Sequence, residues 1–123
     1  MSNHADLVDR YIAGWNETDA GRRRDLIART WTESARYVDP LMQSEGHAGI
    51  DGMIRGVQER FPGLRFRLEG NVDGYADRVR FCWALAPDQG DALVKGTDFA
   101  VVADGKLAAV TGFIDQMPAA SAA

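Results

Sequence analysis

The stretch Ala35-Arg36-Tyr37-Val38-Asp39-Pro40 decides how this chain is organised, because it predicts a strand that ends on an acid. A residue directly before proline is restricted to extended or turn geometry, so the Asp39 side chain is held at the strand end. If that side chain faces an apolar hollow, Asp39 is a candidate general base. If it instead accepts backbone N–H groups of the turn after Pro40, its role is structural. The sequence leaves both roles open.

Two amphipathic helices are predicted before this strand. Apolar residues recur at helical spacing from residue 4 to 16, and they do so again after a cap at Thr18 or Asp19. The arginine run Arg22–Arg24 is interpreted as a solvated face of the second helix.

A third helix is predicted after the strand, with apolar positions from Ile50 to Val57 and an end near Phe61. Its glycines weaken it but leave room beside it for a sheet or a bulky ligand. They are Gly49, Gly52 and Gly56.

From residue 64 onward the hydrophobic period changes to two, which is typical of half-buried strands. Further strands are predicted over 78–86, 92–102 and 107–114. A turn is predicted at 71–74, with 75–77 left open as its exact position, and another at Asp104-Gly105. Helices followed by an antiparallel meander indicate the α+β class. A curved sheet with helices on one face leaves a hollow, which is the default ligand site.

The composition is that of one globular domain, predicted over 1–118 with a loose tail at 119–123: the chain has 123 residues, 46% of them hydrophobic and 26% charged. A net charge of −4 argues against a nucleic-acid partner, and no apolar run is long enough for a membrane. A cytoplasmic location is expected, since the N-terminus lacks a signal pattern and Cys82 is the only cysteine. Two histidines without a cysteine pair predict no metal site, and no cofactor motif is present.

The order of these elements resembles the NTF2-like superfamily, and most closely its SnoaL-like and ketosteroid-isomerase-like branch. The resemblance spans Tyr11 to Phe113 and is carried by short motifs: Tyr11-Ile12, Tyr37-Val38-Asp39-Pro40, Gly46 to Ile50, Gly96-Thr97-Asp98-Phe99, and Asp104-Gly105-Lys106 with Val110-Thr111-Gly112-Phe113. It implies a cone-shaped barrel, in which three N-terminal helices pack on a curved, mainly antiparallel sheet and enclose an apolar pocket.

The same resemblance implies three catalytic roles. Asp39 matches the general base that moves a proton between carbon atoms of an enolisable ketone. Tyr11 matches the phenol that donates to the enolate oxygen, and Asp98 matches the protonated acid that completes this oxyanion hole. The sequence departs from the isomerases at Ile54, where they have a tyrosine that supports the phenol.

The residues themselves also allow structural roles. Tyr11 lies on an apolar helix stripe and is equally consistent with core packing. Asp98 alternates with small, apolar residues, where an acid is costly unless it is paired or protonated. We therefore expect Asp98 to face the cavity, to pair with Arg80 or Arg67, or to lie exposed.

The predicted substrate-binding residues are aromatic, with one histidine at the pocket mouth as a second acid–base group. They are Trp15, Tyr37, Phe61, Phe66, Trp83, Phe99, Phe113 and His47. Aromatic side chains of a small domain also serve as plain core, so pocket wall and core are both open for them.

The sequence thus predicts a small-molecule pocket protein, of the isomerase or cyclase type if it is an enzyme, that transfers a proton on an apolar carbonyl compound without a cofactor. The alternatives are non-catalytic binding of a hydrophobic metabolite and water activation as in epoxide hydrolases. A sheet with little charge on either face also predicts a homodimer formed through the sheet.

Overall fold

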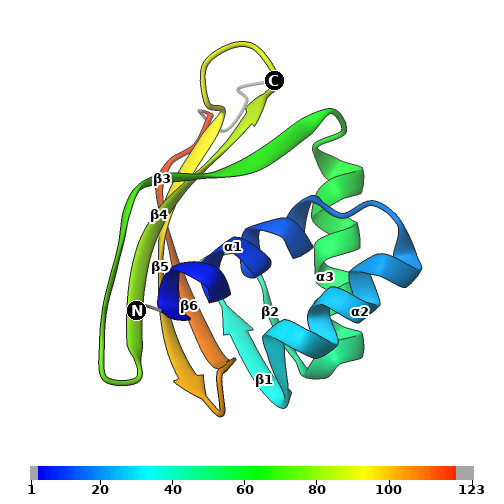
Figure 1. Ribbon diagram of the computed structural model, residues 1–123. Helices are drawn as coiled ribbons and strands as arrows, with labels where there is room; N and C mark the ends of the chain where they lie inside the picture. The colour runs from blue at the N-terminus through cyan, green and yellow to red at the C-terminus, as the bar shows by residue number, and fades with distance from the viewer. Residues whose placement is uncertain (1–2, 119–123) are drawn as a thin grey trace.

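Three helices lie against one curved, six-stranded sheet in the computed structural model, which describes residues 3–118 (Figure 1). The elements are α1 (Asn3–Asn16), α2 (Ala20–Thr30), β1 (Trp31–Val38), β2 (Gln43–Glu45), α3 (Gly46–Arg60), β3 (Leu64–Tyr75), β4 (Arg78–Pro87), β5 (Val94–Ala103) and β6 (Lys106–Gln116). The predicted α+β class is confirmed, and so is the order of the three helices and five of the six strands, whereas β2 lies where a loop was expected. The predicted tail at 119–123 lies outside the described residues.

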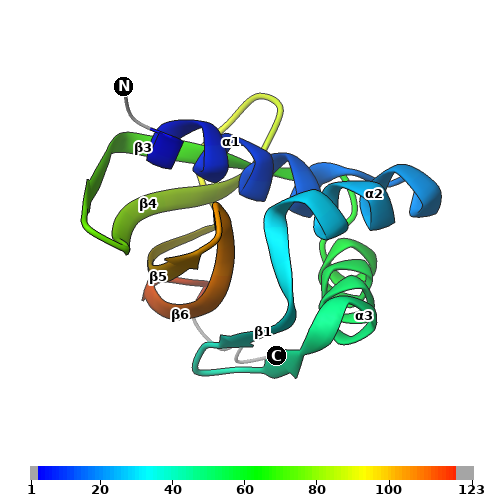
Figure 2. The same ribbon diagram turned by 60° about the horizontal axis from the view of Figure 1, so that its bottom comes forward.

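The sheet runs in the order β2-β1-β6-β5-β4-β3. Neighbouring strands are antiparallel except β1 and β6, which are parallel. The sheet has two edge strands, β2 and β3, so the cone is open and not a closed barrel. Figure 2 shows how strongly the sheet curls and how α1 crosses it while α3 stands beside it.

The two predicted hairpin turns had different outcomes. Asp104 and Gly105 both have positive φ, as the two-residue turn between β5 and β6 requires, and this turn is confirmed. Of the two positions left open for the other turn, 71–74 is wrong, because β3 continues to Tyr75 and the chain reverses at Ala76 and Asp77. The turn-forming residues instead belong to a stretch, after Gly70 with its positive φ, where the register of β3 against β4 shifts.

Strand alternation separates the two faces of the sheet as predicted. In β4, Val79, Phe81 and Trp83 are buried against the helices, whereas Cys82 between them is exposed. Because side chains alternate along a strand, the large apolar ones of β4 share the concave face. The core therefore lies between that face and the helices.

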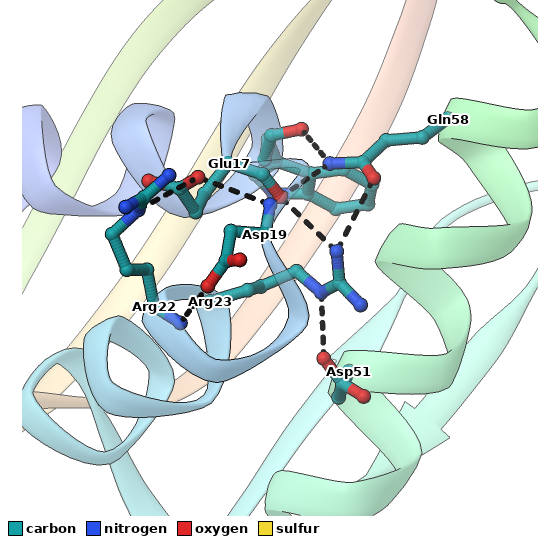
Figure 3. A network of polar contacts seen from close by, with 7 residues as sticks. Glu17, Asp19, Arg22, Arg23, Asp51 and Gln58 are labelled. Carbon is teal, nitrogen blue, oxygen red and sulfur yellow. Dashed lines mark hydrogen bonds and ion pairs between the residues drawn. The ribbon is translucent and has the colours of Figure 1, made fainter.

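The arginine run of α2 is not a fully solvated face. Arg23 is only 3% exposed, and its Nε donates to Oδ1 of Asp51 at 2.6 Å (Figure 3). Its Nη1 donates to the Glu17 carbonyl and to Oε1 of Gln58. Gln58 in turn donates to the carbonyls of Trp15 and Glu17. One buried cation thus ties α2 to the end of α1 and to α3.

Within residues 3–118, no helix combines the length and apolarity that crossing a membrane requires.

Candidate acid–base and ligand-binding site

A cavity of about 510 Å³ lies between α1, α3 and the concave face of the sheet. This volume is within the usual range for sites that hold small organic molecules. Most of its wall is apolar or aromatic, and its charged or phenolic groups are Tyr11, Tyr37, Asp39, Arg60 and Asp98. The three predicted catalytic side chains therefore line one cavity.

Asp98 points into this cavity from the middle of β5 and is 1% exposed. Its Oδ2 accepts the Tyr11 hydroxyl at 2.6 Å, and its Oδ1 accepts the indole N–H of Trp83 at 2.9 Å. The two arginines that could have formed an ion pair with Asp98 have other partners: Arg80 pairs with Asp73, and Arg67 pairs with Glu69. No ion pair of Asp98 occurs among residues 3–118.

Burial raises the pKa of Asp98 to about 6. The hydrogen bonds from Tyr11 and Trp83 lower this pKa, and the nearby Asp39 charge raises it. A carboxyl group with a pKa near neutrality exchanges protons readily under physiological conditions, which is what general acid–base catalysis needs.

Asp39 both caps its turn and lines the cavity. Its Oδ1 accepts the backbone N–H groups of Leu41 at 2.8 Å and Met42 at 3.0 Å. Its Oδ2 accepts the Tyr37 hydroxyl at 2.6 Å. Asp39 therefore has the turn contacts of its structural role and also faces the cavity, and three donors hold its carboxylate.

Two glycines let this polar group assemble. A Cβ on Gly112 would lie 2.9 Å from Oδ1 of Asp98 and 3.2 Å from both the Tyr37 hydroxyl and Cβ of Asp39. A Cβ on Gly96 would collide with the Trp83 ring. The absence of these side chains allows the two acids to meet at β6 and the indole to reach Asp98.

Both tyrosines keep their protons. Burial and the charge of Asp98 raise the pKa of Tyr11 well above its ordinary value, and the same two causes raise that of Tyr37. Each phenol is therefore a hydrogen-bond donor, Tyr11 to Asp98 and Tyr37 to Asp39.

Five of the predicted substrate-binding residues line the cavity: Trp15, Tyr37, Phe61, Phe66 and Trp83. Three do not, and these predictions are corrected. Phe99 and Phe113 are 45% and 51% exposed, because strand alternation turns Phe99 away from the inward-facing Asp98 and Phe113 away from the inward-facing Gly112. His47 lies at the start of α3, where its Nε2 is 2.9 Å from the Trp31 carbonyl.

Ile54 is 1% exposed in the core and is not part of the cavity wall. The second phenol of the site is Tyr37 of β1, and Trp83 supplies the additional donor to Asp98. The sequence predicted Trp83 only as a residue of the pocket wall. Strand alternation shows which face of the sheet a side chain is on, but not which acceptor its N–H group reaches. Arg60 was not predicted at all, because a charged residue in the last turn of a helix is usually a solvated side chain.

The described residues contain no group of three or more His, Cys, Asp or Glu side chains placed to hold a metal ion.

The fold and the cavity together define a cone-like α+β protein of the NTF2-like kind, with a buried acid in an apolar hollow. The SnoaL-like domain family matches residues 8–110, and the chain belongs to that family. Among proteins with curated descriptions, none matches this sequence.

Solved structures agree with this assignment. A candidate isomerase of the SnoaL-like family from Agrobacterium tumefaciens strain C58 is 44% identical, with 94% of this chain and 100% of that chain covered and a TM-score of 0.89. A candidate SnoaL-like polyketide cyclase from Jannaschia sp. CCS1 is 23% identical, with coverage of 92% and 85% and a TM-score of 0.74. A candidate ketosteroid isomerase from Kribbella flavida DSM 17836 is 22% identical, with coverage of 94% and 79% and a TM-score of 0.70. The last two show a shared fold.

Proposed function

We propose that this protein is an isomerase or cyclase that transfers a proton on an apolar carbonyl compound, with Asp98 as the acid–base group. The observation that carries the proposal is a buried carboxyl group with a pKa of about 6 in a cavity whose wall is mostly apolar or aromatic. The candidate isomerase at 44% identity supports the same class of reaction.

In the proposed reaction, ionised Asp98 takes a proton from the carbon beside a carbonyl group, and the substrate becomes an enolate. Protonation neutralises Asp98, so the Tyr11 hydroxyl is free to turn from Oδ2 to the enolate oxygen. Asp98 then returns the proton to another carbon. Alternatively, the enolate carbon attacks a second carbonyl group and closes a ring, and the alkoxide formed there takes the proton from Asp98. Neither route needs an oxidant or a reductant.

This proposal exchanges the roles that the resemblance implied for Asp39 and Asp98. The Asp39 carboxylate is held by two backbone amides and the Tyr37 hydroxyl, which leaves less of it open to a substrate proton. Asp98 has two donors, from Tyr11 and Trp83, and sits deeper in the cavity wall.

Water activation of the epoxide-hydrolase kind is supported less well. That reaction needs an arginine between two acids in the pocket, but Arg67 and Arg80 form ion pairs outside the cavity. Arg60, the one arginine in the cavity wall, makes no ion pair with either acid among the described residues.

The test is deuterium exchange into the methyl group of 4-acetylbiphenyl, a flat apolar ketone, followed by proton NMR in D₂O. General base catalysis contributes about 10²- to 10⁴-fold, so Asp98→Asn is expected to slow exchange at least about 100-fold. Asp39→Asn is expected to slow it less, and Asp88→Asn, in an exposed loop, is the matched control.

Exchange by Asp98→Asn within a few-fold of the parent rate would show that Asp98 is not the acid–base group. A larger loss in Asp39→Asn than in Asp98→Asn would restore Asp39 as the base. Saturable binding of the ketone without any exchange in the parent protein would identify a binding protein and contradict the enzyme proposal.

A further inference from the structure

The cavity wall contains one cation, Arg60, and it has no ion pair or hydrogen bond within residues 3–118. Its guanidinium lies 5.8 Å from the centre of the neighbouring Phe61 ring. Stacking on an aromatic ring leaves the edge of the guanidinium, with its N–H donors, available to another partner.

Arg60 lies at the end of the cavity far from Asp98. It is the last residue of α3, and Phe61 then leads to Leu64, which pairs with Pro87 at the end of β4. In Figure 1 this end of α3 and the connection from β4 to β5 both lie at the top of the molecule.

Asp98 lies further along the same sheet, where it pairs with Phe81. Phe81 and the cavity-lining Leu85 are four residues apart on β4. At a rise of about 3.3 Å per residue, this corresponds to about 13 Å along the strand. The cavity therefore has an acidic inner end at Asp98 and Asp39 and a cationic outer end at Arg60.

Between these ends, five residues of α3 line the cavity: three are glycines, Gly49, Gly52 and Gly56, and the other two are Met53 and Val57. Gly52 and Gly56 line the cavity, and a Cβ on either would meet no atom within 4 Å. An extended apolar ligand can therefore lie along α3 with its far end beside Arg60. The C-terminus of α3 carries the negative end of the helix dipole, about half an elementary charge, which opposes the binding of an anion. Arg60 carries a full positive charge at the same place, so the net charge there still attracts an anion.

We propose that the ligand of this cavity carries an acid group, a carboxylate or another anion, that binds Arg60 while its carbonyl end reaches Asp98. The reverse orientation places an anion against Asp98, which is buried, and Asp39, which is partly exposed, and is repelled. The proposal rests on the proposed function for what happens at the carbonyl end. Its test is a binding measurement that needs no turnover. The anion-binding proposal can therefore fail while the proposed proton transfer stands, and the reverse is also possible.

The probes are 4-(4-acetylphenyl)benzoate, a rigid ketone with a carboxylate at its other end, and the corresponding neutral amide. We expect the acid to bind the parent protein about fivefold more tightly than the amide at low salt. Arg60→Gln is expected to remove this preference, with the affinity for the acid falling more than the affinity for the amide. Arg55→Gln, which removes the same charge from an exposed position of α3 outside the cavity, retains the preference.

The affinities are measured by calorimetry, after thermal melts have shown that both variants fold. Added salt is expected to reduce the preference of the parent protein for the acid, because ions screen an accessible pair. Equal affinities for acid and amide, no binding of the acid, or equal losses in Arg60→Gln and Arg55→Gln would each overturn the proposal.

Discussion

The Tyr11 hydroxyl donates a 2.6 Å hydrogen bond to Oδ2 of Asp98, which joins the first helix to the fifth strand across 87 residues of sequence. Both side chains are buried, at 3% and 1% exposure. Burial favours the neutral acid, whereas the hydrogen bonds from Tyr11 and Trp83 favour the carboxylate. Because burial raises the pKa of Asp98 more than these hydrogen bonds lower it, the carboxyl group titrates near neutrality.

Asp98 is expected to make the fold more stable at pH 4 than at pH 7. Its pKa is about 6 in the folded protein against an ordinary value of 3.8, so between these values the folded state binds more protons than the unfolded state. The contribution is present below pH 4 and is lost as pH rises to about 6. Two pKa units correspond to about 3 kcal/mol.

Urea unfolding of the parent protein and of Asp98→Asn at several pH values measures this contribution. Asparagine does not titrate, so the free energy of unfolding of the variant should rise relative to the parent between pH 4 and 6. A difference that does not change with pH would contradict the raised pKa.

Tyr11→Phe is expected to move the pH dependence of exchange upward. The exchange rate of the parent should rise with pH around a midpoint near 6, as Asp98 becomes a carboxylate. Because the hydrogen bond from Tyr11 lowers the pKa of Asp98, its loss should raise the midpoint and cost about 1 to 3 kcal/mol of stability. Tyr75→Phe, at a highly exposed position, is the control. An unchanged midpoint in Tyr11→Phe would show that this hydrogen bond does not tune Asp98.

Gly52→Ala and Gly56→Ala are expected to stabilise the protein while weakening binding. Alanine in a helix interior is favoured over glycine by about 0.5 to 1 kcal/mol, and neither new methyl group meets a neighbour. Each methyl group occupies ligand space, so the affinity for 4-acetylbiphenyl should fall. Gly14→Ala in α1 has the same open surroundings but does not line the cavity, and it should leave affinity unchanged. Unaltered affinity in both α3 variants would show that the ligand does not lie along this helix.

Arg23→Ala is expected to destabilise the fold by about 3 to 5 kcal/mol, because it leaves the Asp51 carboxylate without its buried partner. Arg24→Ala removes an exposed arginine of the same helix and should change stability by less than about 0.5 kcal/mol. Denaturant unfolding compares the two. Equal effects would mean that the contacts of Arg23 in Figure 3 do not hold the helices together.

We also propose that two copies of the chain associate through the outer face of the sheet. Phe99 and Phe113 lie edge to face there, with ring centres 5.7 Å apart, and both are about half exposed. The double variant Phe99→Ser, Phe113→Ser should shift a dimer to the 13.5 kDa monomer in light scattering, whereas Leu93→Ser should not. A parent protein that is monomeric at micromolar concentration would contradict this proposal.

Local pattern determined the parts of this protein that depend on near neighbours in the chain. Helical and alternating periods predicted the three helices and five of the six strands, and alternation put Asp98 on the same face of its strand as small, apolar residues. The same alternation could have excluded Phe99 from the pocket, since Phe99 follows Asp98 directly. The turn at 71–74 failed because residues that favour a turn also favour an irregular strand.

Tertiary structure alone decided what each polar group touches. The partners of Asp98 come from α1 and β4, and those of Arg23 come from α3 and from Glu17, which follows α1. The separations of these pairs in the sequence correspond to no helical or strand period. The pKa of Asp98 depends on burial by all of these elements together, and the burial of Arg23 depends on Asp51 and Gln58 being within reach. Asp39 depends on both local sequence and tertiary structure. Its position at a strand end follows from Pro40, whereas its position beside Gly112 and near Asp98 follows from the packing of the sheet.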